Sequence, residues 1–115
     1  ASQAILKGLA PDGGLFVPES IPSLDKSLEE LSKMSYKEVA YEVMKLMLDD
    51  FTEEELKNCI DKAYDSKFDT EEIAPLVKAE GAYFLELFHG ATIAFKDMAL
   101  SILQHQLRRM MLKMK

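Results

Sequence analysis

One lysine of this sequence lies where an amine could react rather than only carry charge. The stretch FHGATIAFKD, residues 88–97, places Lys96 directly after the apolar residues 93–95. In the first turn of a helix, the positive end of the helix dipole disfavours an ammonium, and so does partial burial among apolar neighbours. Only the neutral amine attacks an aldehyde, so Lys96 is a candidate Schiff-base nucleophile, although the carboxylate of Asp97 would oppose this if it approached the amine. An ordinary lysine at a helix start, with its stem along apolar neighbours, is the alternative.

The other reactive side chains indicate structure rather than chemistry. Cys59 lies on the apolar stripe of a predicted helix, which indicates a buried core thiol rather than a reactive one. His89 and His105 do not have the spacing of metal ligands with that cysteine, so we expect no metal site. The acidic run 53–55 suits the positive end of a helix better than an acid/base pair.

Helix starts are marked by three capping boxes, in which a hydroxyl residue is followed three positions later by a glutamate. The pairs are Ser27 with Glu30, Ser35 with Glu38, and Thr52 with Glu55. Apolar residues spaced by three and four follow the second and third boxes, so we expect helices over 36–49 and 53–65. Nearer the N-terminus, we expect a short helix over 2–7 and a short apolar strand over 15–17.

The elements around Lys96 are predicted from a change in the apolar pattern after residue 68. The apolar runs 73–77 and 82–88 indicate a hairpin or two neighbouring strands. A loop over 89–92 follows, and then a final helix that begins near residue 94 or 95. Strand, glycine loop and helix form a unit that places reactive groups at the carboxyl end of a strand.

Composition and length indicate one globular domain. The chain has 115 residues, of which 48% are apolar and 30% are charged. The expected elements give an α+β class that is mainly helical. A net charge of −6 argues against nucleic-acid binding, and no apolar run is long enough to cross a membrane. A single cysteine fits a reducing compartment, so a cytoplasmic location is expected. The sequence begins at Ala1 and stops within a predicted helix, so we expect a longer parent protein.

Two long motifs resemble those of one enzyme family. Residues 85–97, LELFHGATIAFKD, resemble the pyridoxal-phosphate lysine motif of the threonine synthases. Residues 4–18, AILKGLAPDGGLFVP, are similar to the opening of the N-terminal domain of the same family. The two motifs occur in the family's order, and between them the resemblance covers nearly the whole chain.

The resemblance implies a fold-type II enzyme, a phosphate-eliminating lyase with pyridoxal 5′-phosphate as cofactor. Such an enzyme converts O-phospho-L-homoserine and water to L-threonine and phosphate. By this similarity, Lys96 would bind the cofactor covalently and would move protons during elimination and hydration. His89 and Thr92 would be candidate substrate-binding residues. Each has a structural alternative, because His89 could order the loop and Thr92 could cap the final helix.

The sequence departs from the family's pattern in two ways. Ala91 stands where the family usually has proline, which loosens the loop before Thr92. The five glycines are at positions 8, 13, 14, 81 and 90, so no glycine-rich loop for the cofactor phosphate follows Lys96. The resemblance therefore implies the family's N-terminal domain over 1–80 and the start of its cofactor domain over 81–115. We expect this piece to be inactive alone.

A non-catalytic interaction module is the alternative function. The final helix has apolar residues over much of its circumference, more than one buried face requires. These residues are Phe95, Met98, Ala99, Ile102, Leu103, Leu107, Met110, Met111 and Met114. If the surface that they form stays exposed, we expect the chain to dock on a partner or to self-associate through residues 95–114.

Overall fold

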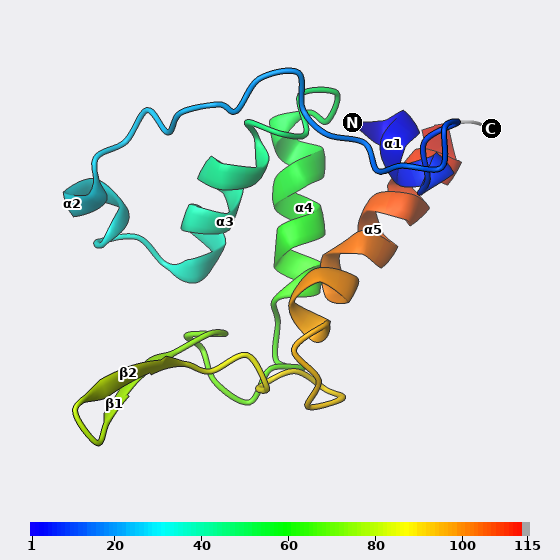
Figure 1. Cartoon of the computed structure of the whole chain (residues 1–115). Coiled ribbons are helices and arrows are strands. Elements are labelled where there is room, and N and C mark those ends of the chain that lie inside the picture. Colours follow the sequence, from blue (N-terminus) through cyan, green and yellow to red (C-terminus); the bar gives the residue numbers. More distant parts are fainter. Residues whose placement is uncertain (114–115) are drawn as a thin grey trace.

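The computed structural model describes residues 1–113, which form a mainly helical α+β fold (Figure 1). The elements are α1 (Ser2–Lys7), α2 (Leu28–Leu31), α3 (Tyr36–Met44), α4 (Glu53–Ala63), β1 (Leu76–Ala79), β2 (Ala82–Leu85) and α5 (Asp97–Lys113). The predicted fold class is therefore confirmed. Within residues 1–113, no helix combines the length and the apolar character needed to cross a lipid bilayer.

All three predicted capping boxes are formed, at the starts of α2, α3 and α4. At α4, for example, the amide of Glu55 donates to the hydroxyl of Thr52 at 3.3 Å, and the amide of Thr52 donates to the Glu55 carboxylate at 3.2 Å. Each cap stabilises its helix by about 1 kcal/mol, because it satisfies amides that have no partner within the helix.

Several predicted bounds differ from the structure: β1 covers Leu76–Ala79 rather than 73–77, and the final helix begins at Asp97 rather than near 94 or 95. Two predictions nearer the N-terminus are wrong. The helix expected over 36–49 ends at Met44, because the chain tightens there into three-residue turns, with the amide of Met47 donating to the carbonyl of Met44. The strand expected over 15–17 is a loop, and its side chains are exposed. That segment pairs with no strand among the described residues, so its apolar run has no sheet to join.

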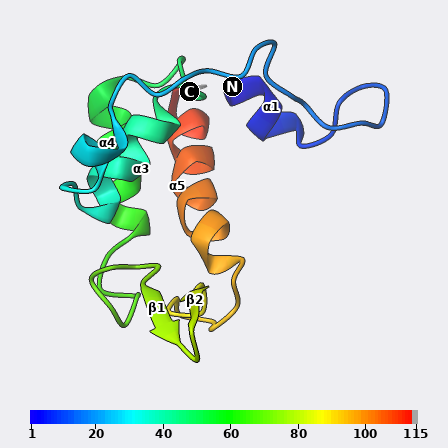
Figure 2. The same cartoon turned by 60° about the vertical axis from the view of Figure 1, so that its left-hand side comes forward.

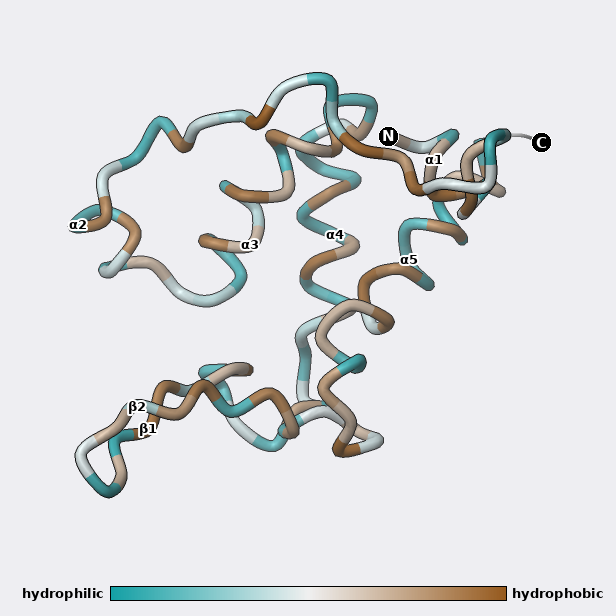
Figure 3. Tube along the Cα trace, in the orientation of Figure 1, coloured by the Kyte–Doolittle hydropathy of each residue, from teal (hydrophilic) through white to brown (hydrophobic). Residues whose placement is uncertain are grey.

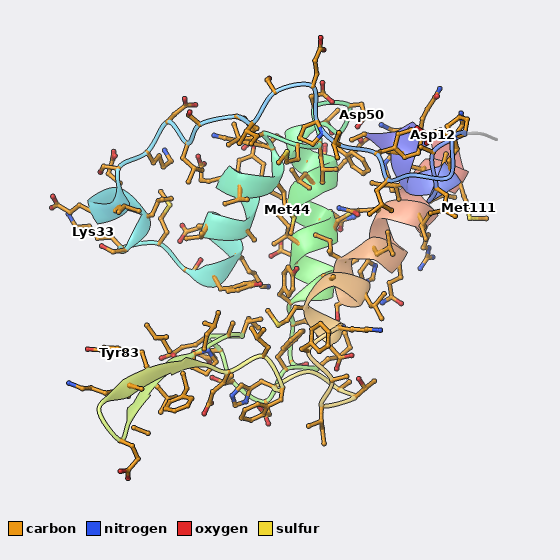
Figure 4. The ribbon with its side chains drawn as sticks, viewed as in Figure 1. Asp12, Lys33, Met44, Asp50, Tyr83 and Met111 are labelled. Atoms are coloured by element: carbon orange, nitrogen blue, oxygen red, sulfur yellow. The ribbon has the colours of Figure 1, made fainter. Side chains whose placement is uncertain are left out.

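The core is built around α4, which packs against α3 on one side and α5 on the other (Figure 1). Its buried members are Leu56, Cys59, Ile60, Ala63, Tyr64, Phe68, Ile73 and Ile102. Figure 4 shows Met44 between α3 and α4, where it packs against this cluster. Burying each large apolar side chain contributes about 1.5–3 kcal/mol. Cys59 is buried as predicted, and burial raises the pKa of its thiol.

Glu55 joins the start of α4 to the end of α5. Besides its role in the capping box, its carboxylate accepts hydrogen bonds from Arg109 and Lys113. Burial raises the pKa of Glu55, but the bonds from Lys113, Thr52 and Arg109 together outweigh burial and lower it. These bonds hold the C-terminal end of α5 against the start of α4.

The predicted hairpin is present and stands apart from the helices (Figures 1 and 2). Its antiparallel strands are joined by Glu80 and Gly81, which have positive φ angles of 50° and 79°. A two-residue turn with two positive φ angles matches the twist of the strands. The strands are mostly apolar, as Figure 3 shows, although β1 contains Lys78, and all their side chains are exposed. Tyr83 is labelled in Figure 4 on this hairpin, away from the helical core.

Candidate functional site

Lys96 is the last residue before α5, at the end of the segment that connects β2 to this helix. Its carbonyl accepts hydrogen bonds from the amides of Ala99 at 3.1 Å and Leu100 at 2.9 Å, so it initiates the helix. Its side chain is exposed, and the neighbours Ile93 and Phe95 are 73% and 65% exposed. The expectation of a partly buried amine is wrong for this chain, because the apolar side chains expected to cover it face solvent themselves.

An apolar groove of about 550 Å³ lies beside Lys96. Its walls come from the first residue of α3, the segments that flank the hairpin, and the start of α5. The lining residues are Tyr36, Ala74, Leu85, Leu87, Phe95, Lys96, Met98, Ala99 and Leu100. Within this set, the amine of Lys96 and the phenol of Tyr36 are the polar side-chain groups. The groove therefore offers an amine beside a surface suited to an apolar or aromatic group.

Two tyrosines brace the start of α5 against α3 and α4. The rings of Tyr36 and Tyr64 meet edge to face, with centroids 4.9 Å apart. The hydroxyl of Tyr64 donates to the carbonyl of Met98 at 2.8 Å. Burial raises the pKa of both phenols, so both are neutral near pH 7. This bracing fixes the position of the helix turn that follows Lys96.

Residues 90–96, the Lys96 loop, are closed by the carboxylate of Asp97, which is only 8% exposed. The carboxylate accepts two hydrogen bonds from Thr92, one from the amide at 2.7 Å and one from the hydroxyl at 2.6 Å. Gly90 packs so closely that a Cβ atom there would lie 2.5 Å from the Cβ of Asp97. Sequence reasoning considered Asp97 only as a carboxylate that could approach Lys96, and did not assign it a role in the loop, because an acidic residue at a helix start is typical of helices with no functional role.

The Lys96 loop holds one strained residue. Ile93 has a φ angle of 66°, in the left-handed region that a β-branched residue rarely adopts. Such a conformation costs about 1–2 kcal/mol, so other contacts must enforce it. The amide of Ile93 donates to the carbonyl of Gly90 at 3.0 Å, and the amide of Asp97 donates to the carbonyl of Ala94 at 3.0 Å. The loop thus consists of two consecutive turns, and Lys96 lies in the second.

His89 lies just before this loop and is held between two carboxylates. Its Nδ1 is 2.5 Å from Asp69 Oδ1, and its Nε2 is 2.8 Å from Glu86 Oε2. Its carbonyl also accepts a hydrogen bond from the amide of Asp69, and its ring stacks on Phe88. The bonds to Glu86 and Asp69 raise the pKa of His89. These contacts are those of the alternative role, in which His89 orders the loop.

Thr92 is in the Lys96 loop but does not cap α5. The helix begins at Asp97, and the hydroxyl of Thr92 donates to that residue's carboxylate instead. The same hydroxyl accepts a bond from the amide of Ala94 at 3.4 Å. In the structure, Thr92 therefore lies in the same loop as Lys96, whereas the His89 ring lies outside this loop and contacts Asp69 and Glu86.

Comparison with known proteins points to one family. The family model described as "Threonine synthase N terminus" matches residues 1–64. The chain is 41% identical over 107 residues to the threonine synthase of Saccharomyces cerevisiae, covering 85% of this chain and 21% of that protein. It is 46% identical over 105 residues to the threonine synthase of Schizosaccharomyces pombe, covering 88% of this chain and 20% of that protein. The chain therefore spans about a fifth of the length of these relatives.

A solved structure shares the fold. The X-ray crystal structure of a PLP-bound threonine synthase from Brucella melitensis is 32% identical and superposes with a TM-score of 0.86. The match covers 97% of this chain and 25% of that one. The similarity therefore extends through the hairpin, the Lys96 loop and α5.

Proposed function

Because this chain belongs to the threonine synthase family, we propose that it forms the N-terminal part of a pyridoxal-phosphate enzyme. The reaction would be the conversion of O-phospho-L-homoserine and water to L-threonine and phosphate, with loss of phosphate by elimination. The observation that supports this most directly is Lys96, an amine at the junction of an ordered loop and a helix, beside an apolar groove. The family's lysine motif falls on that same residue.

The residues present fit one end of the cofactor. The Lys96 amine would hold it covalently, and the groove walls would contact its aromatic ring. The residues present do not fit the phosphate group of the cofactor. The groove is lined by no glycine, and Gly90 is the last glycine of the sequence, so no glycine-rich loop is available to bind a phosphate. Residues of a longer protein would bind that phosphate. When bound, the cofactor supplies an electron sink for the carbanion formed at the substrate's α-carbon.

Lys96 would then take up and return protons during elimination and hydration. This work requires an amine that is not permanently paired with a carboxylate. Lys96 takes part in none of the ion pairs formed by residues 1–113, and the neighbouring Asp97 is occupied by Thr92. The tyrosine bracing of α5 would keep the amine at the groove.

Substrate contacts by His89 and Thr92 stay predictions. Both side chains are already engaged, His89 with Asp69 and Glu86, and Thr92 with Asp97. Binding a substrate phosphate would require at least a partial exchange of these partners. The division into an N-terminal domain over 1–80 and a cofactor domain from 81 is part of the same proposal. So is a cytoplasmic location, which suits the buried, unpaired Cys59.

Activity in the full-length protein that carries this chain tests the proposal. Lys96→Ala should lower the rate of threonine formation by about 10²–10⁴-fold or more, since it removes both the cofactor linkage and the proton carrier. Lys78→Ala on the exposed hairpin is the matched control and should leave the rate unchanged. Full activity in Lys96→Ala would refute the assignment.

A second candidate function is self-association, and exposed apolar surface favours it. The exposed apolar surface of α5 is smaller than expected, because Ile102 and Met110 are buried within the domain. Met114 lies outside the described residues. The large apolar residues that remain exposed between 95 and 113 are Phe95, Leu100, Met111 and Leu112. We propose that copies of this chain associate through these residues and through the exposed hairpin. Figure 4 shows that Met111, at the C-terminal end of α5, lies far from the hairpin, so the exposed apolar surface is in two parts.

A further inference from the structure

We propose that Asp97 is a positioning residue for Lys96, acting through Thr92 and through the close packing at Gly90. The inference rests on the proposed function, because it concerns how the Lys96 amine is presented to its partner molecules. Asp97 need not touch the reacting atoms. Its role is to fix the loop that ends in Lys96.

The first observation is that one residue satisfies both oxygens of the Asp97 carboxylate. Oδ2 accepts the amide of Thr92 at 2.7 Å, and Oδ1 accepts its hydroxyl at 2.6 Å. Two bonds from one residue fix the direction of the carboxylate and of the loop backbone at the same time. Hydrogen bonds to a carboxylate are stronger than neutral ones, and the Asp97 side of this pair is buried although Thr92 is exposed.

The second observation is the packing at the other end of the Lys96 loop. A Cβ atom on Gly90 would lie 2.6 Å from Asp97 Oδ2, the oxygen that accepts the Thr92 amide. A side chain there would push the carboxylate away from Thr92. Gly90, at the start of the loop, therefore packs against the same Asp97 carboxylate that binds Thr92. Lys96 immediately precedes Asp97 in the chain.

The third observation concerns charge. Asp97 is adjacent to Lys96 in sequence and would be an obvious counter-ion for its ammonium. The bonds to Thr92 turn this carboxylate into the loop, and Lys96 is absent from the ion pairs formed by residues 1–113. Asp97 thereby positions the lysine without pairing with its amine, which must lose a proton to react.

The test begins with two nearly isosteric variants of the full-length protein. Asp97→Asn places an NH₂ group or a weaker acceptor against the Thr92 amide, and Thr92→Val removes the hydroxyl. We expect each to lower kcat by about tenfold or more, since small misplacements of a reacting group are costly. The KM for the substrate should change by less than about threefold. The circular dichroism of the bound cofactor should weaken, because it reports how rigidly the ring is held.

Two controls separate positioning from a general loss of structure. Thr92→Ser keeps both hydrogen-bond groups and should restore kcat to within about twofold of the unmutated protein. Asp61→Asn alters an exposed carboxylate bonded to Lys37 and should have no effect. In the 115-residue chain, amide exchange at Thr92 should become at least about tenfold faster in Asp97→Asn, while Ile60 in α4 keeps its protection.

The outcomes distinguish this inference from the proposed function. If the cofactor is bound by Lys96, yet kcat and Thr92 exchange stay within about twofold in Asp97→Asn and Thr92→Val, the positioning role is overturned and the proposed function stands. Equal losses in Thr92→Val and Thr92→Ser would overturn it as well. If the cofactor is bound by another lysine, the proposed function fails, and the exchange experiment still decides whether Asp97 fixes the loop. If Asp97→Asn does not fold, Thr92→Val decides.

Discussion

The imidazole of His89, held between Asp69 and Glu86, makes the segment before Lys96 sensitive to pH. When protonated, the ring donates to both carboxylates; when neutral, it can donate to only one. The hydrogen bonds to Glu86 and Asp69 raise its pKa above the ordinary value of 6.5. No such shift exists in the unfolded chain, so protonation favours the folded state.

The sign of the pH effect follows directly. The stabilisation from His89 is fully present below pH 6.5 and is lost as the pH rises through the raised pKa of the folded protein. An NMR titration of the imidazole should give a pKa above 6.5 for His89, and Asp69→Asn with Glu86→Gln should lower it. His105 is an internal control, because burial lowers its pKa. A His89 pKa at or below 6.5 in the unmutated chain would contradict this account.

The sequence was informative about some site residues and silent about others. Lys96 could be proposed as the cofactor lysine because the motif in which it lies is local and specific. The partners of His89 could not all be found, because Asp69 lies 20 residues away and only the fold brings the two together. The burial of Lys96 was overestimated, since the apolar character of its neighbours does not say which way they face.

Among the elements, the junction of α4 and α5 depends on Glu55, which caps one helix and pairs with the end of the other. Glu55→Gln retains the capping geometry but removes the charge that Arg109 and Lys113 bind. We expect it to lower the free energy of unfolding by about 1 kcal/mol, the usual contribution of such bonds. Urea unfolding of the 115-residue chain measures the change.

Glu30→Gln is the matched control for that experiment. Glu30 has the same place in the capping box of α2, but its carboxylate is bonded to Ser27 alone and joins no second helix. Its substitution should destabilise the chain much less. Equal effects of the two substitutions would show that Glu55 acts only as a cap.

Helix starts could be predicted better than the other element boundaries. A capping box is a local pattern of two side chains, so the starts at Ser27, Ser35 and Thr52 follow from the sequence. The end of α3 at Met44 depends on how the chain must turn back towards α4. The apolar segment 15–17 forms no strand because a strand requires a partner, and a single segment does not reveal one.

At the scale of the whole molecule, the exposed apolar surface of the hairpin and α5 predicts self-association. Sedimentation of the 115-residue chain at tens of micromolar should show a dimer or larger species. Met111→Glu with Leu112→Glu should weaken the association by about tenfold or more, because charges would be buried at the contact. Val17→Glu, in an exposed loop, is the control and should change nothing. A clean monomer at these concentrations would contradict the prediction.

The length of the chain relative to its relatives leads to a second prediction at this scale. The 115-residue chain alone should form no threonine and should show no saturable binding of pyridoxal phosphate, because its sequence has no glycine-rich loop after Lys96 to bind the cofactor phosphate. A titration followed by visible absorbance measures this, with Lys96→Ala as the baseline. Saturable binding at micromolar concentration that Lys96→Ala removes would show that this chain holds the cofactor unaided.

Borohydride reduction of the full-length protein with pyridoxal phosphate, followed by peptide mapping in a mass spectrometer, tests whether Lys96 is the residue that binds the cofactor. We expect the label on the peptide that contains Lys96 and not on that of Lys78, which is also exposed, on the hairpin. A label concentrated on any other lysine, with Lys96 unmodified, would contradict it.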